Sequence, residues 1–138
     1  MIKNYILEVE DLIDYKVRGI ISPVSMHYLA WELNKHFDFD LQRIEDHRIK
    51  EKNLDSKHIL YSDHLHEESD LFLLQNKGQG GLLLPQHQML DAILLERNYD
   101  GDFMPNFLEK IQTPSMQLCL DIAYSELTDL EKLNIEIK

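Results

Sequence analysis

The sequence predicts an α+β fold: a mixed, mainly antiparallel sheet of five to seven strands with two helices on one face. Three observations lead to this fold class. Two segments repeat apolar residues at helical spacing, several short segments alternate apolar and polar residues as half-buried strands do, and the links between segments are short. Short links favour antiparallel pairing, so a ferredoxin-like core with an inserted hairpin is the specific expectation.

The clearest element is a helix predicted from Ser22 to Phe37. Ser22 suits the N-cap because its hydroxyl accepts an otherwise unpaired amide hydrogen bond, and Pro23 suits the first helical position. The apolar residues gather on one side of the helix at about 100° per residue, and this stripe should pack on the sheet. It consists of Met26, Leu29, Ala30, Leu33 and Phe37.

The segments on either side of this helix are predicted strands. Residues 2–9 alternate weakly and predict a first edge strand, whereas residues 14–21 alternate as a half-buried strand does. After the helix, residues 41–51 and 58–65 predict two antiparallel strands joined by a polar turn at 52–57.

The second half of the chain continues with a strand at 70–77 and a glycine-rich turn at Lys77–Gly81. Met89–Arg97 is apolar on both faces, which is typical of a central strand. A second helix is predicted over Asp102–Gln112, and the clearest alternation in the chain predicts a strand over 116–122. Strand, helix and strand with short links predict a right-handed crossover and a parallel pair.

Length and composition predict one domain, residues 1–138, because 43% hydrophobic residues in this length fill one core and not two. The formal charge of −11 at pH 7 repels phosphate backbones and anionic lipid surfaces, so neither nucleic acid nor a membrane is an expected partner. The single cysteine, Cys119, excludes an internal disulfide. No apolar run approaches the roughly 20 residues of a membrane span, and the expected location is cytoplasmic.

Two segments resemble a known family. Residues 27–46, HYLAWELNKHFDFDLQRIED, are similar to a pattern of the IPExxxVDY-type proteins of the Bacteroidota, and residues 84–92, LPQHQMLDA, stand in the place of the signature that names this family. Pro85 and Asp91 match the signature, whereas Gln86 replaces its glutamate and Ala92 its tyrosine. The resemblance implies no activity, and the two replacements weaken any mechanism that needs the signature carboxylate or phenol.

The histidines suggest a metal site that the spacing does not support. His64 and His66 would project from one strand face, but His58, which shares this parity, would lie about 20 Å from His64 along a straight strand. A solvated strand end explains them better, so no metal or cofactor is expected. Cys119 has no histidine nearby in sequence to lower its pKa and is interpreted as structural.

The most notable polar residue is Asp91, because a carboxylate near the start of a doubly buried strand must be paired or hydrogen-bonded. His87, Asn76 or the backbone of the glycine-rich turn would satisfy it, and a structural anchor is favoured over an acid or base. Asn34, on the flank of the first helix, is likewise either a helix-end hydrogen bonder or a site residue.

Tyr28 and Trp31 fall outside the apolar stripe of the first helix. They either meet a second layer of the fold, for instance the tail after Ile122, or form a partner surface of the kind enriched in tyrosine and tryptophan.

No set of residues forms a recognisable catalytic motif, so the leading hypothesis is a non-catalytic binding or protein-interaction module. Its partner would be a protein, a small molecule or a second copy bound through a sheet face or the two aromatic rings. The alternative is a small enzyme or ligand sensor with a pocket around Asn76, Pro85, His87 and Asp91.

Overall fold

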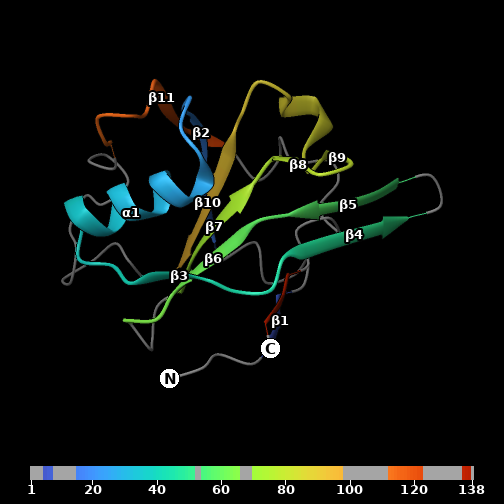
Figure 1. The fold of residues 1–138 in the computed structure, drawn as a ribbon, viewed down its shortest axis with the longest axis horizontal. Coiled ribbons are helices and arrows are strands. Elements are labelled where there is room, and N and C mark those ends of the chain that lie inside the picture. The colour runs from blue at the N-terminus through green and yellow to red at the C-terminus, as the bar shows by residue number, and fades with distance from the viewer. Residues whose placement is uncertain are drawn as a thin grey trace.

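A computed structural model of the protein describes residues 5–7, 15–51, 54–65, 70–97, 112–122 and 135–137. Its main element is a six-stranded sheet with the strand order β11-β2-β10-β7-β6-β3 (Figure 1). Every neighbouring pair in this sheet is antiparallel. The strands are β2 (Lys16–Ile21), β3 (Leu41–Arg43), β6 (Leu60–Asp63), β7 (Asp70–Gln75), β10 (Ala92–Arg97) and β11 (Leu118–Ile122).

The predicted α+β class is therefore confirmed, with a mostly antiparallel sheet and a helix. Within the described residues there is one α-helix, α1 (Met26–His36), which lies on one face of the sheet (Figure 1). Of the second predicted helix, Asp102–Gln112, all but the last residue lies outside the described residues, as does the whole connection from 98 to 111.

The predicted first turn of α1 was wrong. The helix begins at Met26, and its N-cap is Ser25, whose hydroxyl accepts a hydrogen bond of 3.2 Å from the backbone N–H of Tyr28. Ser22 is not available as a cap because its own N–H and hydroxyl donate to Asp91 and to the carbonyl of Ser115.

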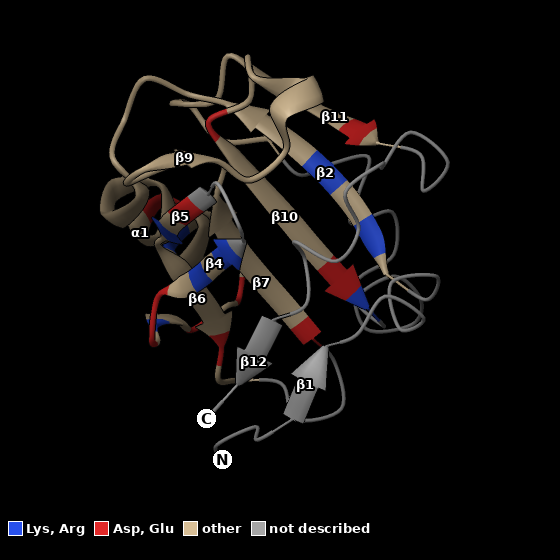
Figure 2. Ribbon diagram, turned by 90° about the vertical axis from the view of Figure 1, so that its right-hand side faces the viewer, with Lys and Arg blue, Asp and Glu red and all other residues tan. Residues whose placement is uncertain are grey.

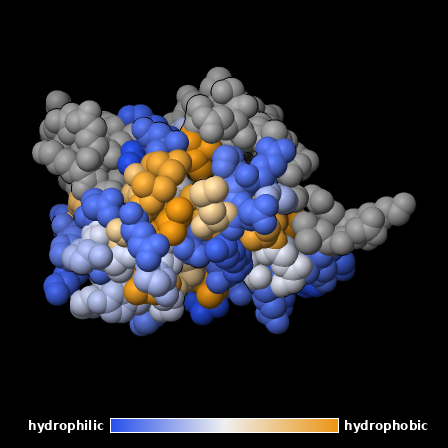
Figure 3. Space-filling view, turned by 90° about the horizontal axis from the view of Figure 1, so that it is seen from above, coloured by the Kyte–Doolittle hydropathy of each residue, from blue (hydrophilic) through white to orange (hydrophobic). Residues whose placement is uncertain are grey.

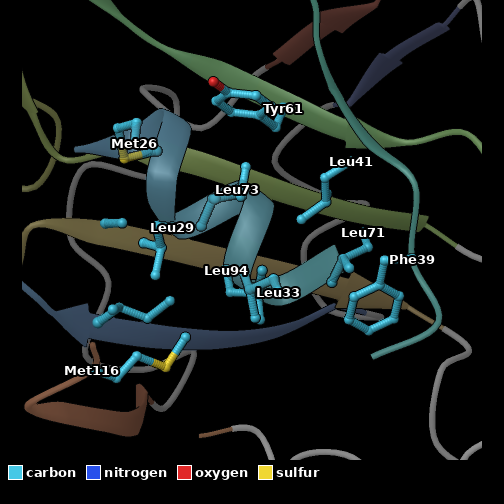
Figure 4. Close-up of a cluster of buried hydrophobic side chains, with 13 residues drawn as sticks. Met26, Leu29, Leu33, Phe39, Leu41, Tyr61, Leu71, Leu73, Leu94 and Met116 are labelled. Carbon is cyan, nitrogen blue, oxygen red and sulfur yellow. The ribbon is translucent and has the colours of Figure 1, made fainter. Parts of the chain in front are cut away.

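Both faces of the sheet are buried. Beneath α1, the predicted stripe residues Met26, Leu29, Ala30 and Leu33 pack against side chains of the sheet (Figure 4). A second cluster covers the opposite face, and it includes Phe72 and Leu74 from β7 and Ile93 and Leu95 from β10. The central strands are thus apolar on both sides, and charged residues on β10 are confined to its end (Figure 2).

The central position of β10 was predicted correctly, but its start and its neighbour were not. The strand begins at Ala92, because residues 85–91 form a short 3-10 helix, η2 (Pro85–His87), and a turn. The predicted parallel pair with 116–122 was wrong. β10 and β11 run in the same direction, but β2 lies between them and pairs antiparallel with both.

The strand predicted over 41–51 is divided into β3 and β4 (His47–Glu51), and the polar turn predicted at 52–57 is largely strand β5 (Leu54–His58). β4 and β5 form a hairpin that projects beyond the main sheet (Figure 1). In β5 the buried face carries Ser56 and His58. A search for alternating hydrophobicity misses this strand because its inward residues are polar.

The predicted hairpin turn at Gly78–Gly81 is confirmed as the link between β8 (Lys77–Gly78) and β9 (Gly81–Leu82). Gly80 has a φ of +100°, which residues with a side chain rarely adopt, and a Cβ there would lie 2.4 Å from the carbonyl oxygen of Asp55. Glycine lets this hairpin lie directly on β5, where Gln79 and Lys57 exchange backbone hydrogen bonds.

The first predicted edge strand is β1 (Tyr5–Leu7), which pairs with β12 (Ile135–Ile137) in a separate two-stranded sheet and not with the main sheet. The helical turn predicted near Thr128 lies outside the described residues. Among the residues that are described, no helix has the length and apolar character needed to cross a bilayer.

Leu33 lies on the inner side of α1 and is fully buried. Replacing it with alanine should lower the free energy of unfolding by about 2–5 kcal/mol, because the lost side chain leaves a cavity. Urea denaturation followed by far-UV circular dichroism measures this change. The matched control is Leu118→Ala, since Leu118 is 42% exposed and its loss should cost less than about 1 kcal/mol. Equal losses in the two variants would contradict the packing of α1 on the sheet.

Candidate functional site

Asn76 organises the loop of residues 83–91, which precedes β10 and which we call the η2 loop. Its side-chain amide donates hydrogen bonds of 2.9 Å to the carbonyl oxygens of His87 and Leu90, and its Oδ1 accepts one of 2.8 Å from the N–H of Leu84. Its backbone N–H donates to the carbonyl of Asp91 and its carbonyl accepts from the N–H of Leu83. Asn76 is fully buried, and these five bonds satisfy it as a structural residue.

Asp91 joins three segments. Its Oδ2 accepts a hydrogen bond of 2.9 Å from the N–H of Ser22, and its Oδ1 lies 3.2 Å from the ammonium nitrogen of Lys77. Its backbone N–H donates to the carbonyl of Ile20 at the end of β2. The carboxylate is therefore paired, as its position beside a buried strand requires. The expected partners were wrong: the side chain of Lys77 and the backbone of Ser22 pair with the carboxylate, whereas Asn76 bonds only the backbone carbonyl of Asp91.

The structure does bring Asn76, Pro85, His87 and Asp91 into one loop. Pro85 is exposed at the first position of η2, and the backbone of His87 bonds within the loop to Leu84 and Leu90. The imidazole Nε2 of His87 is buried and has no hydrogen-bond partner among the described residues. The apolar side chains beneath the loop are buried in the core; they are Leu83, Leu84 and Leu90.

Asn34 holds the end of α1 to the start of β3. Its amide donates a hydrogen bond of 3.2 Å to the carbonyl of Leu41, and its Oδ1 accepts one of 2.8 Å from the N–H of the same residue. This pair of bonds satisfies the backbone of Leu41 as a neighbouring strand would. The geometry is that of a structural anchor.

A buried carboxylate that was not identified from the sequence is that of Glu32. It lies on α1, is 3% exposed, and its Oε1 accepts hydrogen bonds from the N–H of Ser115 at 3.2 Å and from the hydroxyl of Ser115 at 2.5 Å. Burial raises the pKa of Glu32, but the hydrogen bonds from Ser115 outweigh it, so the pKa lies below the ordinary value. The carboxylate ties α1 to the turn before β11.

A third polar cluster lies at the far end of the central strands. The hydroxyl of Tyr15 donates a hydrogen bond of 2.8 Å to Asp70 at the start of β7, and Arg97 at the end of β10 forms an ion pair with the same carboxylate. The guanidinium of Arg97 also lies over the ring of Tyr15, 5.1 Å from its centroid. The charged groups at this end of the sheet are therefore paired with one another.

Two of the three histidines considered as metal ligands, His58 and His64, lie within the described residues. His64 follows β6 and is partly buried, and His66 lies outside the described residues. His58 is fully buried in β5, where its Nδ1 lies 2.9 Å from the carbonyl oxygen of Gln75 and its Nε2 lies 2.8 Å from the hydroxyl of Ser56. A carbonyl only accepts, so Nδ1 carries the proton and Nε2 accepts from Ser56.

No group of three or more histidine, cysteine, aspartate or glutamate residues within the described ranges is arranged to hold a metal ion. Cys119 is partly buried on β11, and the Nε of Arg18 lies 3.3 Å from its sulfur. Burial raises the pKa of the Cys119 thiol, against the opposing effect of Arg18, so the thiolate needed for nucleophilic chemistry is disfavoured.

Tyr28 and Trp31 are exposed on the outer side of α1, at 45% and 48% of their surfaces. Their ring centroids are 5.4 Å apart, and the ammonium of Lys35 lies 5.0 Å from the centroid of the Trp31 ring. We call these three residues the α1 surface. The tail after Ile122, named above as a possible second layer, lies outside the described residues. The exposure of the two rings is the feature expected of a partner surface.

Two other regions of the surface resemble a partner surface less than the α1 surface does. Figure 3 looks onto the end of the molecule that carries β11 and the η2 loop, and apolar atoms are exposed there between hydrophilic ones; Met89 and Leu118 are 65% and 42% exposed. A hollow of about 270 Å³ lies at the β4–β5 hairpin. Its lining is charged: Glu45, Asp46, Arg48 and Lys57.

Comparison of the chain with family models, with curated proteins and with solved structures finds no match. The function must therefore be inferred from the arrangement of the residues themselves.

Replacing Asn76 with alanine should lower the free energy of unfolding by about 2–5 kcal/mol, because three buried backbone groups of the loop lose their partners. Asn76→Asp should also destabilise the fold, since a carboxylate oxygen would face the carbonyls of His87 and Leu90. Urea denaturation measures both, with the exposed Gln86→Ala as control. If Asn76→Ala cost no more than the control, the loop would not depend on this side chain.

Glu32 should make stability depend on pH. Because its pKa in the folded protein lies below the ordinary value of 4.5, ionised Glu32 adds stability above pH 4.5 that is lost as the pH falls through the folded-state pKa. Glu32→Gln removes this contribution. The excess free energy of unfolding of the wild type over the variant should be greatest at neutral pH and shrink below pH 4.5, as measured by urea denaturation. An excess that grew towards acidic pH would have the wrong sign.

Proposed function

We propose that the protein is a non-catalytic binding module that recognises another protein through the α1 surface. The carrying observation is the exposed, mutually contacting pair of Tyr28 and Trp31 on the outer side of a helix whose inner side is anchored in the core. Tyrosine and tryptophan are the residues most enriched at binding hot spots, because each buries a large area at low cost in side-chain entropy.

The contacts within α1 favour a preformed surface. The rings of Trp31 and Tyr28 contact each other at an interplanar angle of 49°, and Trp31 lies beneath Lys35, so the three side chains hold one another in place before any partner arrives. The helix beneath them is fixed at both ends, by Ser25 at its N-terminus and by Asn34 near its C-terminus. A rigid surface loses little freedom on binding, which raises affinity.

The polar residues that were candidates for chemistry are used by the fold, which disfavours the alternative of a small enzyme or ligand sensor. Asn76 and Asp91 hold the η2 loop, and Asn34 holds β3. Apolar side chains of the same loop belong to the core below it. A reactive site needs polar groups directed at a substrate, whereas the side chains of Asn76 and Asn34 bond to the backbone and that of Asp91 to a backbone N–H and to Lys77.

We also propose that the core is ferredoxin-like. Taken in chain order, β2, β7, β10 and β11 would be its four strands, and their spatial order β11-β2-β10-β7 with antiparallel neighbours supports this. The segment between β2 and β7 includes α1 and the added pair β3 and β6. The second helix predicted for such a core, Asp102–Gln112, lies outside the described residues except for Gln112.

Three further properties complete the proposal. The resemblance of residues 27–46 and 84–92 supports membership of the IPExxxVDY-type family. The single cysteine and the acidic composition support a cytoplasmic protein, and the net charge of −11 argues against nucleic acid and anionic membranes as partners.

Replacing Trp31 with alanine should remove the captured partner when tagged protein is incubated with a cell extract of the source organism and bound proteins are identified by mass spectrometry. Loss of a central aromatic anchor costs about 2 kcal/mol or more, which corresponds to about thirtyfold in affinity. Unfolding by urea should be little affected, because the indole is half exposed.

Leu118→Ala is the matched control, since it removes an exposed apolar side chain from β11 and should leave capture unchanged. Capture that survives Trp31→Ala but is lost in Leu118→Ala would move the interface to β11 and contradict the proposal.

A further inference from the structure

We infer that the partner of the α1 surface is an acidic segment of another protein that carries an aromatic or large aliphatic residue among its carboxylates. This inference rests on the proposed function, since it names the kind of partner that the same surface would bind. It is carried by the distribution of charge around Trp31 and by the position of Lys35.

The exposed side chains of α1 carry no negative charge, although the chain has a net charge of −11. The helix contains one acidic residue, Glu32, and that side chain is buried and hydrogen-bonded to Ser115. The helix presents instead an aromatic pair and basic or titratable groups; its exposed residues are His27, Tyr28, Trp31, Lys35 and His36. The α1 surface is thus a local exception on an acidic protein.

Lys35 differs from most other basic residues of the described chain. Five basic side chains are paired with carboxylates of the same molecule; the pairs are Arg18–Asp121, Arg43–Asp46, Arg48–Asp55, Lys77–Asp91 and Arg97–Asp70. Lys50 and Lys57 lie in the field of Asp55. Within the described residues Lys35 forms no ion pair, and its ammonium rests over the ring of Trp31.

An ammonium held over an indole presents a positive charge beside an apolar surface. A carboxylate of a partner would bind the ammonium of Lys35, while a neighbouring apolar side chain would bury the exposed faces of Trp31 and Tyr28. Binding needs both the carboxylate and the apolar side chain of the partner. At physiological salt the screening length is about 8 Å, so charges farther than this from Lys35 act only weakly on a carboxylate bound there.

A second copy of this chain is a poorer occupant. Each copy carries −11, and two α1 surfaces placed together would bring two Lys35 ammonium groups to the same interface. Like charges brought together in an interface cost several kcal/mol unless they are paired. An acidic segment supplies the missing carboxylates.

Trp31 is the single tryptophan of the chain, so tryptophan fluorescence reports on this surface alone. The probes are three synthetic peptides without tryptophan, each with one central phenylalanine flanked by glutamates, by lysines or by glutamines. We expect the glutamate peptide to shift the emission of the full-length protein to shorter wavelength and to bind at least about tenfold more tightly than the others at low salt. The preference should weaken as salt is added.

Two variants isolate the charge. Lys35→Glu should weaken binding of the glutamate peptide by about tenfold and improve binding of the lysine peptide, whereas Lys35→Met should fall between. Lys50→Glu on the exposed side of β4 is the control for net charge and should change neither affinity appreciably. Circular dichroism establishes that each variant is folded.

The outcomes separate this inference from the proposed function. Preference for the lysine peptide would overturn the acidic partner and leave the docking surface standing. The same conclusion would follow if no peptide bound while Trp31→Ala still abolished capture from the extract. Concentration-dependent dimers in analytical ultracentrifugation that Trp31→Ala dissociates would assign the surface to a second copy. Absence of any dependence on Trp31, in peptide binding and capture alike, would overturn both.

Discussion

Burial of β7 and β10 on both faces is the constraint on which the rest of the structure depends. Four successive apolar residues in each strand, Leu71–Leu74 and Ala92–Leu95, are removed from water on alternating sides. Each side therefore needs its own cover. The inner stripe of α1 covers one face, and the side chains of the η2 loop, with Ile49 of β4, belong to the cluster on the other.

A cover made from a loop must be held in place, and this requirement accounts for the contacts of Asn76 and Asp91. Asn76 substitutes for a strand partner by bonding backbone groups of the loop, and Asp91 fixes its end to β2 and Lys77. Glu32 and Asn34 do the same for α1. These four side chains are thus engaged in contacts that hold the fold together.

The parts of the fold that the sequence predicted are those in which neighbouring residues carry the signal. The stripe of α1, the doubly apolar β10 and the turn at Gly78–Gly81 each depend on local periodicity or on the freedom of glycine. The position of β2 between β10 and β11 depends on contacts between distant segments, which spacing along the chain does not record. β10 and β11 therefore run in the same direction, as predicted, but they are not neighbours in the sheet.

The candidate site shows the same division. Asn76, Pro85, His87 and Asp91 were expected together and do share a loop, but their partners, among them Ser22 and Lys77, come from other segments. Glu32 was missed because a glutamate on a helix is ordinarily exposed, and only the turn at Ser115 makes its burial favourable. The sequence did single out Tyr28 and Trp31, since residues outside an apolar stripe are visible from helical spacing alone.

The hydrogen bonds of Asn76 have a consequence for how the molecule opens. A surface loop ordinarily fluctuates independently of the sheet beside it and exchanges its amide hydrogens quickly with solvent. The amides of Leu83 and Leu84 are instead bonded to Asn76, which directly follows β7, and that of Asp91 is bonded to Ile20 in β2. We therefore expect these amides to exchange more slowly than those of an unanchored surface loop, and the loop to open together with the ends of the strands that hold it.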